Sequence, residues 1–175
     1  RVAIPAAAAE WAAGWHAAGG GAPIIALAPG ARHFTKRWPE RHWVDLHARL
    51  AAAGRLVAVV SLAAERAALP SLAAAVETAP TSRWCVEPLP RLAALLARSL
   101  AAVTCDSGLM HLAAATGIPV VALFGSTAPE LGFAPAGAGH AVLCRHEPCQ
   151  PCTLHGRERC PKGHFRCMED LLPAE

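Results

Sequence analysis

Short apolar runs alternate with helical segments along the chain, and this alternation constrains the fold more than any other feature. Apolar runs occupy residues 24–30, 55–62, 83–87, 100–105 and 119–125. They are short and end at Gly, Pro or polar residues, as buried strands do. Helical patterns occupy residues 1–20, 39–54, 63–77, 89–99 and 108–117, with Pro70 interrupting the third. We therefore predict an α/β fold, an open parallel sheet with helices on both faces.

Composition and charge exclude several classes of protein. Hydrophobic residues make up 54% of the 175 residues, so the chain is not disordered as a whole. The net charge is only +3 and Lys and Arg form no dense run, which argues against nucleic acid as a partner. The apolar runs are shorter than the roughly 20 residues needed to span a bilayer. The chain begins at Arg1 without a signal-peptide pattern, so we expect it to be a piece of a longer protein.

The stretch TCDSGLMHLAAATG, residues 104–117, places polar groups between a strand and a helix. Asp106, Ser107 and Gly108 form the turn, and His111 lies in the first helical turn. Ligands of open α/β sheets lie at the carboxyl ends of the strands. The helix N-terminus there offers free N–H groups and a partial positive charge. The stretch therefore predicts a site for a phosphate or a diphosphate.

This stretch has three other interpretations. Asp106 or Ser107 can cap the helix while His111 is an ordinary core histidine, and spacing alone leaves this alternative open. A Ser-His-Asp hydrolase is disfavoured because Asp106 and Ser107 are neighbours and the G-x-S-x-G elbow is absent. A nicotinamide enzyme is disfavoured because the chain has no G-x-G-x-x-G motif.

A second loop, APGARHFTKRWP at residues 28–39, also follows a strand and precedes a helix. It carries Arg32, His33, Thr35, Lys36 and Arg37. Cationic and hydroxyl groups at a second strand end would face the same crevice, where a lysine can meet a phosphate as a point charge. The alternative is a solvated basic loop.

Taken together, the two loops and the segment FGSTAP at residues 124–129 resemble the donor-binding half of glycosyltransferase family 9, the lipopolysaccharide heptosyltransferases. The resemblance covers roughly residues 24–129, with the P-G loop, the D-S-G-x-x-H stretch and F-G-x-T-x-P in the family's order. It implies a GT-B architecture of two Rossmann-like domains, of which this chain supplies the C-terminal one. It also implies transfer from ADP-L-glycero-D-manno-heptose with inversion.

The resemblance also implies roles for individual residues. Lys36 would contact the donor phosphate or heptose, and Asp106 would accept hydrogen bonds from heptose hydroxyls. Other implied donor contacts are Arg32, Thr35, Glu65, Ser107, Gly108, His111, Ser126 and Thr127. Glu65 would face the ribose, although Ser61 stands where the family usually has Gly. Ala31 and Arg32 replace the family's early hydroxyls, which moves the expected phosphate contact to Arg32 or Thr35.

The implied reaction is a direct displacement in which the acceptor oxygen attacks the anomeric carbon and ADP departs. The family's general base lies in the N-terminal domain, so we expect no catalytic residue in this chain and no turnover by the chain alone. The expected partners are ADP-heptose or another nucleotide sugar, and the lipopolysaccharide core through the other domain. No organic cofactor is expected. The expected location is the cytoplasm, and contact of the full-length protein with the inner membrane stays open.

The last part of the chain has a different texture, with Pro, Gly, Cys and His in place of periodic patterns. We predict a nucleotide-sugar-binding domain over residues 1–133 and a Cys/His-rich segment over residues 134–175 that packs on it. Four of the seven cysteines, Cys149, Cys152, Cys160 and Cys167, could bind one structural Zn or Fe, with His155 and His164 as substitute ligands. Reduced thiols and disulfides are the alternatives. A related glycosyltransferase and a non-catalytic, metal-stapled binding module are the competing functions.

Overall fold

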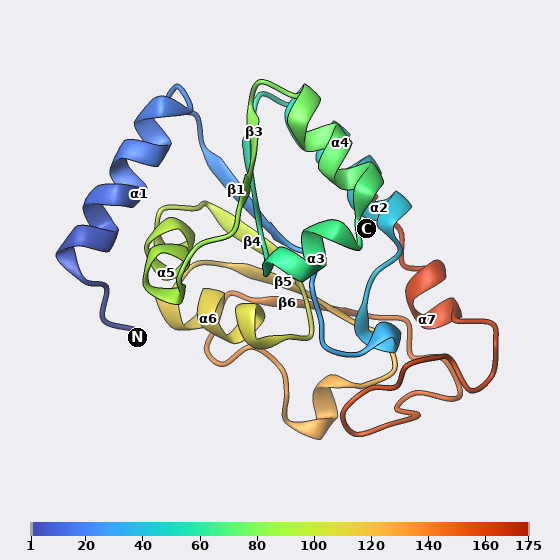
Figure 1. The fold of residues 1–175 in the computed structure, drawn as a ribbon. Coiled ribbons are helices and arrows are strands. Elements are labelled where there is room, and N and C mark those ends of the chain that lie inside the picture. The colour runs from blue at the N-terminus through green and yellow to red at the C-terminus, as the bar shows by residue number, and fades with distance from the viewer. Residues whose placement is uncertain (1, 175) are drawn as a thin grey trace.

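The computed structural model describes residues 2–174, so Arg1 and Glu175, which the two predicted domains include, lie outside the described residues. Its centre is a parallel sheet of six strands in the order β3-β2-β1-β4-β5-β6 (Figure 1). The strands are β1 (Ile24–Ala28), β2 (Leu56–Val60), β3 (Ser82–Cys85), β4 (Ala101–Cys105), β5 (Val120–Phe124) and β6 (Ala141–Cys144). The predicted open parallel sheet is confirmed.

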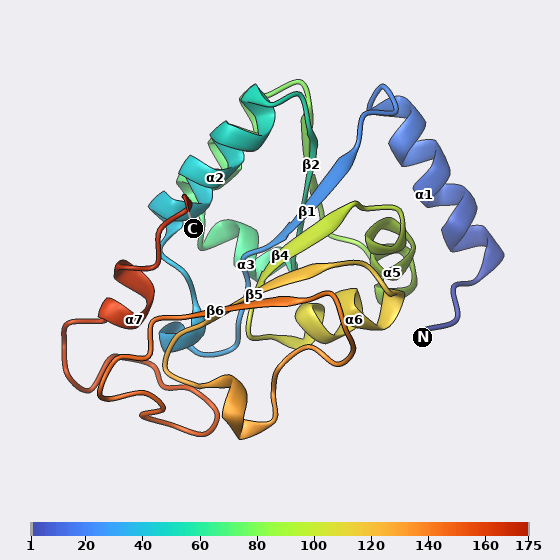
Figure 2. The ribbon, with the colours of Figure 1, turned by 180° about the vertical axis from the view of Figure 1, so that it is seen from behind.

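Helices cover both faces of the sheet, as predicted. They are α1 (Ala6–Ala18), α2 (Glu40–Ala52), α3 (Ala63–Ala67), α4 (Pro70–Thr78), α5 (Leu89–Ala97), α6 (Gly108–Thr116) and α7 (Arg166–Glu169), with short 3₁₀ turns η1 (Phe34–Lys36) and η2 (Pro129–Leu131). Figures 1 and 2 show α1, α5 and α6 on one face and α2, α4 and α7 on the other. Pro70 is the first residue of α4, which explains why the predicted helix over residues 63–77 is divided in two.

Two buried clusters follow from the alternation of side chains along the strands. Alanines such as Ala26, Ala58 and Ala102 point to one face and let α5 and α6 approach closely. Larger residues, among them Leu27 and Val59, point to the other face, against α2, α4 and the C-terminal segment. Because both faces are buried, strands β1, β2 and β5 are apolar throughout rather than alternating with polar residues.

Two elements of the C-terminal segment were not predicted. Strand β6 extends the sheet beside β5, and α7 brings Cys167 and Met168 into the second cluster. Strand β6 is a partly exposed edge strand of four residues, too short to show a clear period. The sheet thus includes residues from both sides of position 133, and the division of the chain there stays a prediction. Within residues 2–174 we find no helix long and apolar enough to cross a membrane.

Strand β1 lies between β2 and β4, so the connection from β3 to β4 carries the chain from one side of β1 to the other. This is a topological switch point, and the loops that follow β1 and β4 diverge there and leave a crevice at the carboxyl edge of the sheet. These are the two loops in which the sequence placed the polar groups, residues 29–39 and residues 106–108.

Candidate functional site

An ion pair joins the two loops at the switch point. Lys36 Nζ lies 2.8 Å from Asp106 Oδ2, and both side chains are largely buried. Thr127, from the loop after β5, donates a hydrogen bond to the same oxygen at 2.8 Å. The Asp106 carboxylate is 3% exposed, and a buried charge of this kind needs such partners to offset its lost hydration.

A polar cavity of about 310 Å³ opens beside this ion pair. Its lining comprises Arg32, His33, Lys36, Asp106, Ser107, Gly108, His111, Phe133 and His155. The Ser107 hydroxyl is buried and has no hydrogen-bond partner among the described residues. A Cβ added to Gly108 would meet no protein atom within 4 Å, so packing does not demand glycine there. Both features suit a wall that receives a polar ligand.

A second, mainly apolar cavity of about 710 Å³ adjoins the first and shares Arg32, Ser107, Gly108 and His111 with it. Four leucines, Leu62, Leu89, Leu109 and Leu112, form much of the remaining lining together with Glu65. Leu62 and Leu89 are each 63% exposed.

Glu65 is held at the edge of the apolar cavity by the start of α3. One carboxylate oxygen accepts a hydrogen bond from the backbone N–H of Leu62 at 2.8 Å. The other oxygen would lie only 1.9 Å from a Cβ added to Gly30, so this close approach depends on glycine in the first loop.

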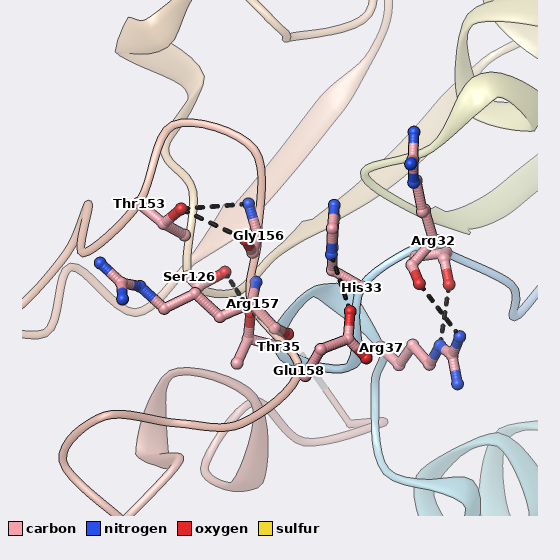
Figure 3. A network of polar contacts seen from close by, with 10 residues as sticks. Arg32, His33, Thr35, Arg37, Ser126, Thr153, Gly156, Arg157 and Glu158 are labelled. Carbon is pink, nitrogen blue, oxygen red and sulfur yellow. Dashed lines mark hydrogen bonds and ion pairs between the residues drawn. The ribbon is translucent and has the colours of Figure 1, made fainter.

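Three of the predicted contact residues point elsewhere. Thr35, Ser126 and Thr127 are at most 1% exposed and do not line either cavity. The Thr127 hydroxyl contacts Asp106, while Ser126 donates to Thr35 Oγ1 at 2.8 Å and Thr35 donates to the Arg157 carbonyl at 3.1 Å (Figure 3). The structure gives these hydroxyls internal partners, and direct contact with a substrate stays a prediction for them.

Two residues of the polar cavity were not predicted for it. Phe133 follows η2, and its ring centroid lies 6.0 Å from that of His155. The sequence suggested His155 only as a metal ligand. Its place in the cavity depends on the C-terminal segment folding back over the first loop, and the local sequence carries no signal of that contact.

The four cysteines expected to bind metal lie in the C-terminal segment, near His164. Cys149 Sγ lies 3.9 Å from His164 Nε2. Among residues 2–174, no group of three or more His, Cys, Asp or Glu side chains is arranged to hold a metal ion. All seven cysteines are free thiols. In this arrangement the four cysteines do not fit a metal site.

A switch-point crevice with a buried ion pair, a helix N-terminus and adjoining polar and apolar cavities defines a Rossmann-like α/β domain with a ligand site at its carboxyl edge. The model of glycosyltransferase family 9 (heptosyltransferase) matches residues 4–162, and the chain belongs to this family.

Individual proteins agree with this assignment. The chain is 39% identical over 158 residues to lipopolysaccharide heptosyltransferase 1 of Pseudomonas aeruginosa (strain PAO1), and the match covers 86% of this chain and 42% of that protein. The structure of E. coli ADP-heptose lipopolysaccharide heptosyltransferase II superposes with a TM-score of 0.79 at 26% identity, covering 99% of this chain and 50% of that one. The E. coli heptosyltransferase WaaC with ADP gives a TM-score of 0.62 at 25% identity, covering 69% and 37%. The chain thus spans about half the length of these relatives or less.

Proposed function

We propose that the chain is the donor-binding half of an inverting heptosyltransferase that uses ADP-heptose and acts on the inner core of lipopolysaccharide. The observation that carries the proposal is the pair of adjoining cavities at the switch point. One is polar and contains a buried ion pair, and the other is apolar with an acid at its edge. A nucleotide sugar is divided in the same way, because its sugar and diphosphate are polar and the faces of its adenine ring are apolar.

The apolar cavity is the proposed place of the adenine and its ribose. Exposed Leu62 and Leu89 offer the adenine ring surfaces that become buried on binding. Glu65 would accept hydrogen bonds from the two ribose hydroxyls, with its carboxylate already held against Gly30.

The diphosphate would lie between the two cavities, over the residues that both share. The N-terminus of α6 directs backbone N–H groups and a partial positive charge there, and Gly108 leaves the approach open. Arg32 and His111 flank the same place and would contribute charge-assisted hydrogen bonds to phosphate oxygens.

The heptose would occupy the polar cavity. Asp106 would accept hydrogen bonds from sugar hydroxyls while Lys36 remains close enough to reach the β-phosphate. In the reaction the acceptor oxygen forms a bond to the anomeric carbon and the bond from that carbon to ADP breaks. Lys36, Arg32 and the α6 N-terminus would stabilise the negative charge that gathers on the departing ADP.

The base that takes the acceptor's proton, the lipopolysaccharide acceptor site and the cytoplasmic membrane surface belong, in this proposal, to the part of the transferase outside this chain. The chain alone would therefore bind nucleotide without turnover. The similarity to a solved heptosyltransferase with ADP supports the choice of ADP.

The test is a calorimetric titration of the chain with ADP, with UDP and GDP as comparators. ADP should bind most tightly, and Lys36→Ala should weaken it about 10- to 100-fold because a charge-assisted contact is lost. Lys162→Ala is the matched control, since Lys162 is exposed and lies outside both cavities.

Equal ADP affinity in Lys36→Ala and wild type would remove Lys36 from the site. A folded chain that prefers UDP or GDP would favour a related glycosyltransferase. A complete transferase that binds no nucleotide would exclude the proposal and leave the non-catalytic binding module.

A further inference from the structure

The tail loop, residues 149–160 of the cysteine-rich segment, lies directly against the first loop of the site. Gly156 has a φ of +108°, and a Cβ added there would lie 2.6 Å from the Cβ of His33. Beside it, His33 Nδ1 contacts the Glu158 carboxylate at 3.1 Å (Figure 3). Contact this close requires glycine, so the two loops are fitted to each other.

Thr35 is the centre of this contact. Its backbone N–H donates to the Arg157 carbonyl at 3.0 Å, and its hydroxyl donates to the same oxygen at 3.1 Å. The Arg157 N–H donates back to the Thr35 hydroxyl at 2.8 Å. Ser126 adds its own hydroxyl donor to Thr35 Oγ1 at 2.8 Å and its N–H donor to the Thr35 carbonyl at 3.1 Å. One buried threonine thus ties together three segments far apart in sequence.

Gln150 fixes the loop after β5 in a similar way. Its side-chain amide nitrogen contacts the Gly125 carbonyl and lies 3.3 Å from the Thr127 carbonyl. Its amide oxygen accepts a hydrogen bond from the Glu147 N–H at 2.9 Å. The Cys152 N–H, from the tail loop, donates to the Ser126 carbonyl at 3.0 Å.

These contacts converge on the buried carboxylate of the site. Thr35 precedes Lys36, and Ser126 precedes Thr127, in the chain. Lys36 and Thr127 are the two residues that contact Asp106 Oδ2, each at 2.8 Å. The tail loop therefore holds the immediate neighbours of both partners of Asp106.

We propose that Thr35 and Gln150 are positioning residues through which the tail loop holds Lys36 and Thr127 on Asp106 and so sets the affinity of the polar cavity for phosphate groups. The effect on phosphate affinity rests on the proposed function. The positioning of Lys36 and Thr127 on Asp106 concerns only the chain's own residues. Without the hydroxyl of Thr35, the Arg157 N–H and the Ser126 hydroxyl lose their acceptor. The first loop, which carries Lys36, is then no longer held in a fixed position relative to Asp106.

The experiment compares Thr35→Val, Thr35→Ser and Gln150→Leu with the wild-type chain. Amide hydrogen exchange without ligand measures how well the backbone of residues 34–37 and 125–128 is protected. Titration with ADP measures the affinity of the site for ADP. Thr35→Val and Gln150→Leu should speed exchange in these two segments and weaken ADP about 10-fold, whereas Thr35→Ser should keep wild-type behaviour. The matched control is Thr78→Val, which removes a hydroxyl that bonds only within α4.

Unchanged exchange and unchanged ADP affinity in Thr35→Val and Gln150→Leu would overturn the proposal. Equal losses in Thr35→Ser and Thr35→Val would also overturn it, because the shared hydroxyl would then be irrelevant. Faster local exchange in the variants, together with no ADP binding by the complete transferase, would support the positioning role while rejecting the proposed function.

Discussion

Residues 24–125 and the tail loop, residues 149–160, are held in place by different interactions. The first region buries apolar side chains on both faces of a sheet, and its core includes fully buried Leu56, Leu95 and Phe124. The tail loop has few buried side chains and is tied down by hydrogen bonds and by the close approach at Gly156. Burial of apolar side chains therefore stabilises the fold, while specific polar contacts of the tail loop fix the geometry of the candidate site.

The largest expected effect comes from a core leucine of the first region. Leu95→Ala in α5 should lower the free energy of unfolding by about 2–5 kcal/mol, because it removes a fully buried side chain and leaves a cavity. Leu154→Ala in the tail loop, where the side chain is 53% exposed, should change it by about 0.5 kcal/mol or less. Urea unfolding measures both. Similar decreases in the free energy of unfolding in the two variants would contradict the proposed difference between the apolar core and the tail loop.

Two glycines near the site distinguish a position that packing requires to be glycine from a position where glycine leaves room for a ligand. A Cβ at Gly125 would lie 2.5 Å from the Thr35 carbonyl and 2.9 Å from Met168, so Gly125→Ala should cost about 1–3 kcal/mol of stability. A Cβ at Gly108 would meet no protein atom within 4 Å, so Gly108→Ala should keep wild-type stability and lose ADP affinity.

Thermal unfolding and ADP titration of the same two proteins separate these effects. A stable Gly125→Ala variant would show that the tail segment adjusts easily to the loop after β5. Unchanged ADP affinity in a folded Gly108→Ala variant would move the diphosphate away from the start of α6.

The alternation of apolar runs with helical patterns, and the polar residues that follow the strands, made much of the fold and of the site predictable. The sheet followed from the apolar runs, since parallel strands buried on both faces have no polar alternation. Arg32, Lys36, Asp106 and His111 could be placed together because their two loops follow neighbouring strands at one edge of the sheet. That inference also needs β1 and β4 to be neighbours, which the structure shows and the order of elements along the chain does not fix by itself.

The remaining features depend on contacts between distant segments. Thr35 and Arg157 are separated by 122 positions, and nothing in the sequence near Thr35 indicates that its hydroxyl bonds inward rather than to a ligand. The presence of His155 in the cavity depends on the same return of the tail loop. Within residues 2–174 the cysteines do not form a group arranged to hold a metal ion, because cysteine spacing shows only which thiols are near in sequence.

The smallest expected effect concerns pH and tests whether the core of the first region limits stability in mild acid. His47 of α2 is 3% exposed, and burial lowers its pKa below the ordinary 6.5. Burial and the neighbouring Arg41 also lower the pKa of His42. Near and below pH 6.5 the unfolded chain therefore binds more protons than the folded chain, so the free energy of unfolding should fall as pH falls from 6.5 toward the lowered pKa values.

Each such histidine can contribute a slope of at most about 1.4 kcal/mol per pH unit. His47→Gln removes one titrating group and should make stability less dependent on pH between 6.5 and 5, even if the variant is less stable throughout. Urea unfolding at several pH values measures the slope. The double variant with His42→Gln should flatten it further, because the two contributions have the same sign. A slope identical to wild type in both variants would show that neither buried histidine limits stability in acid, and the pH dependence would then have to originate from other titratable groups.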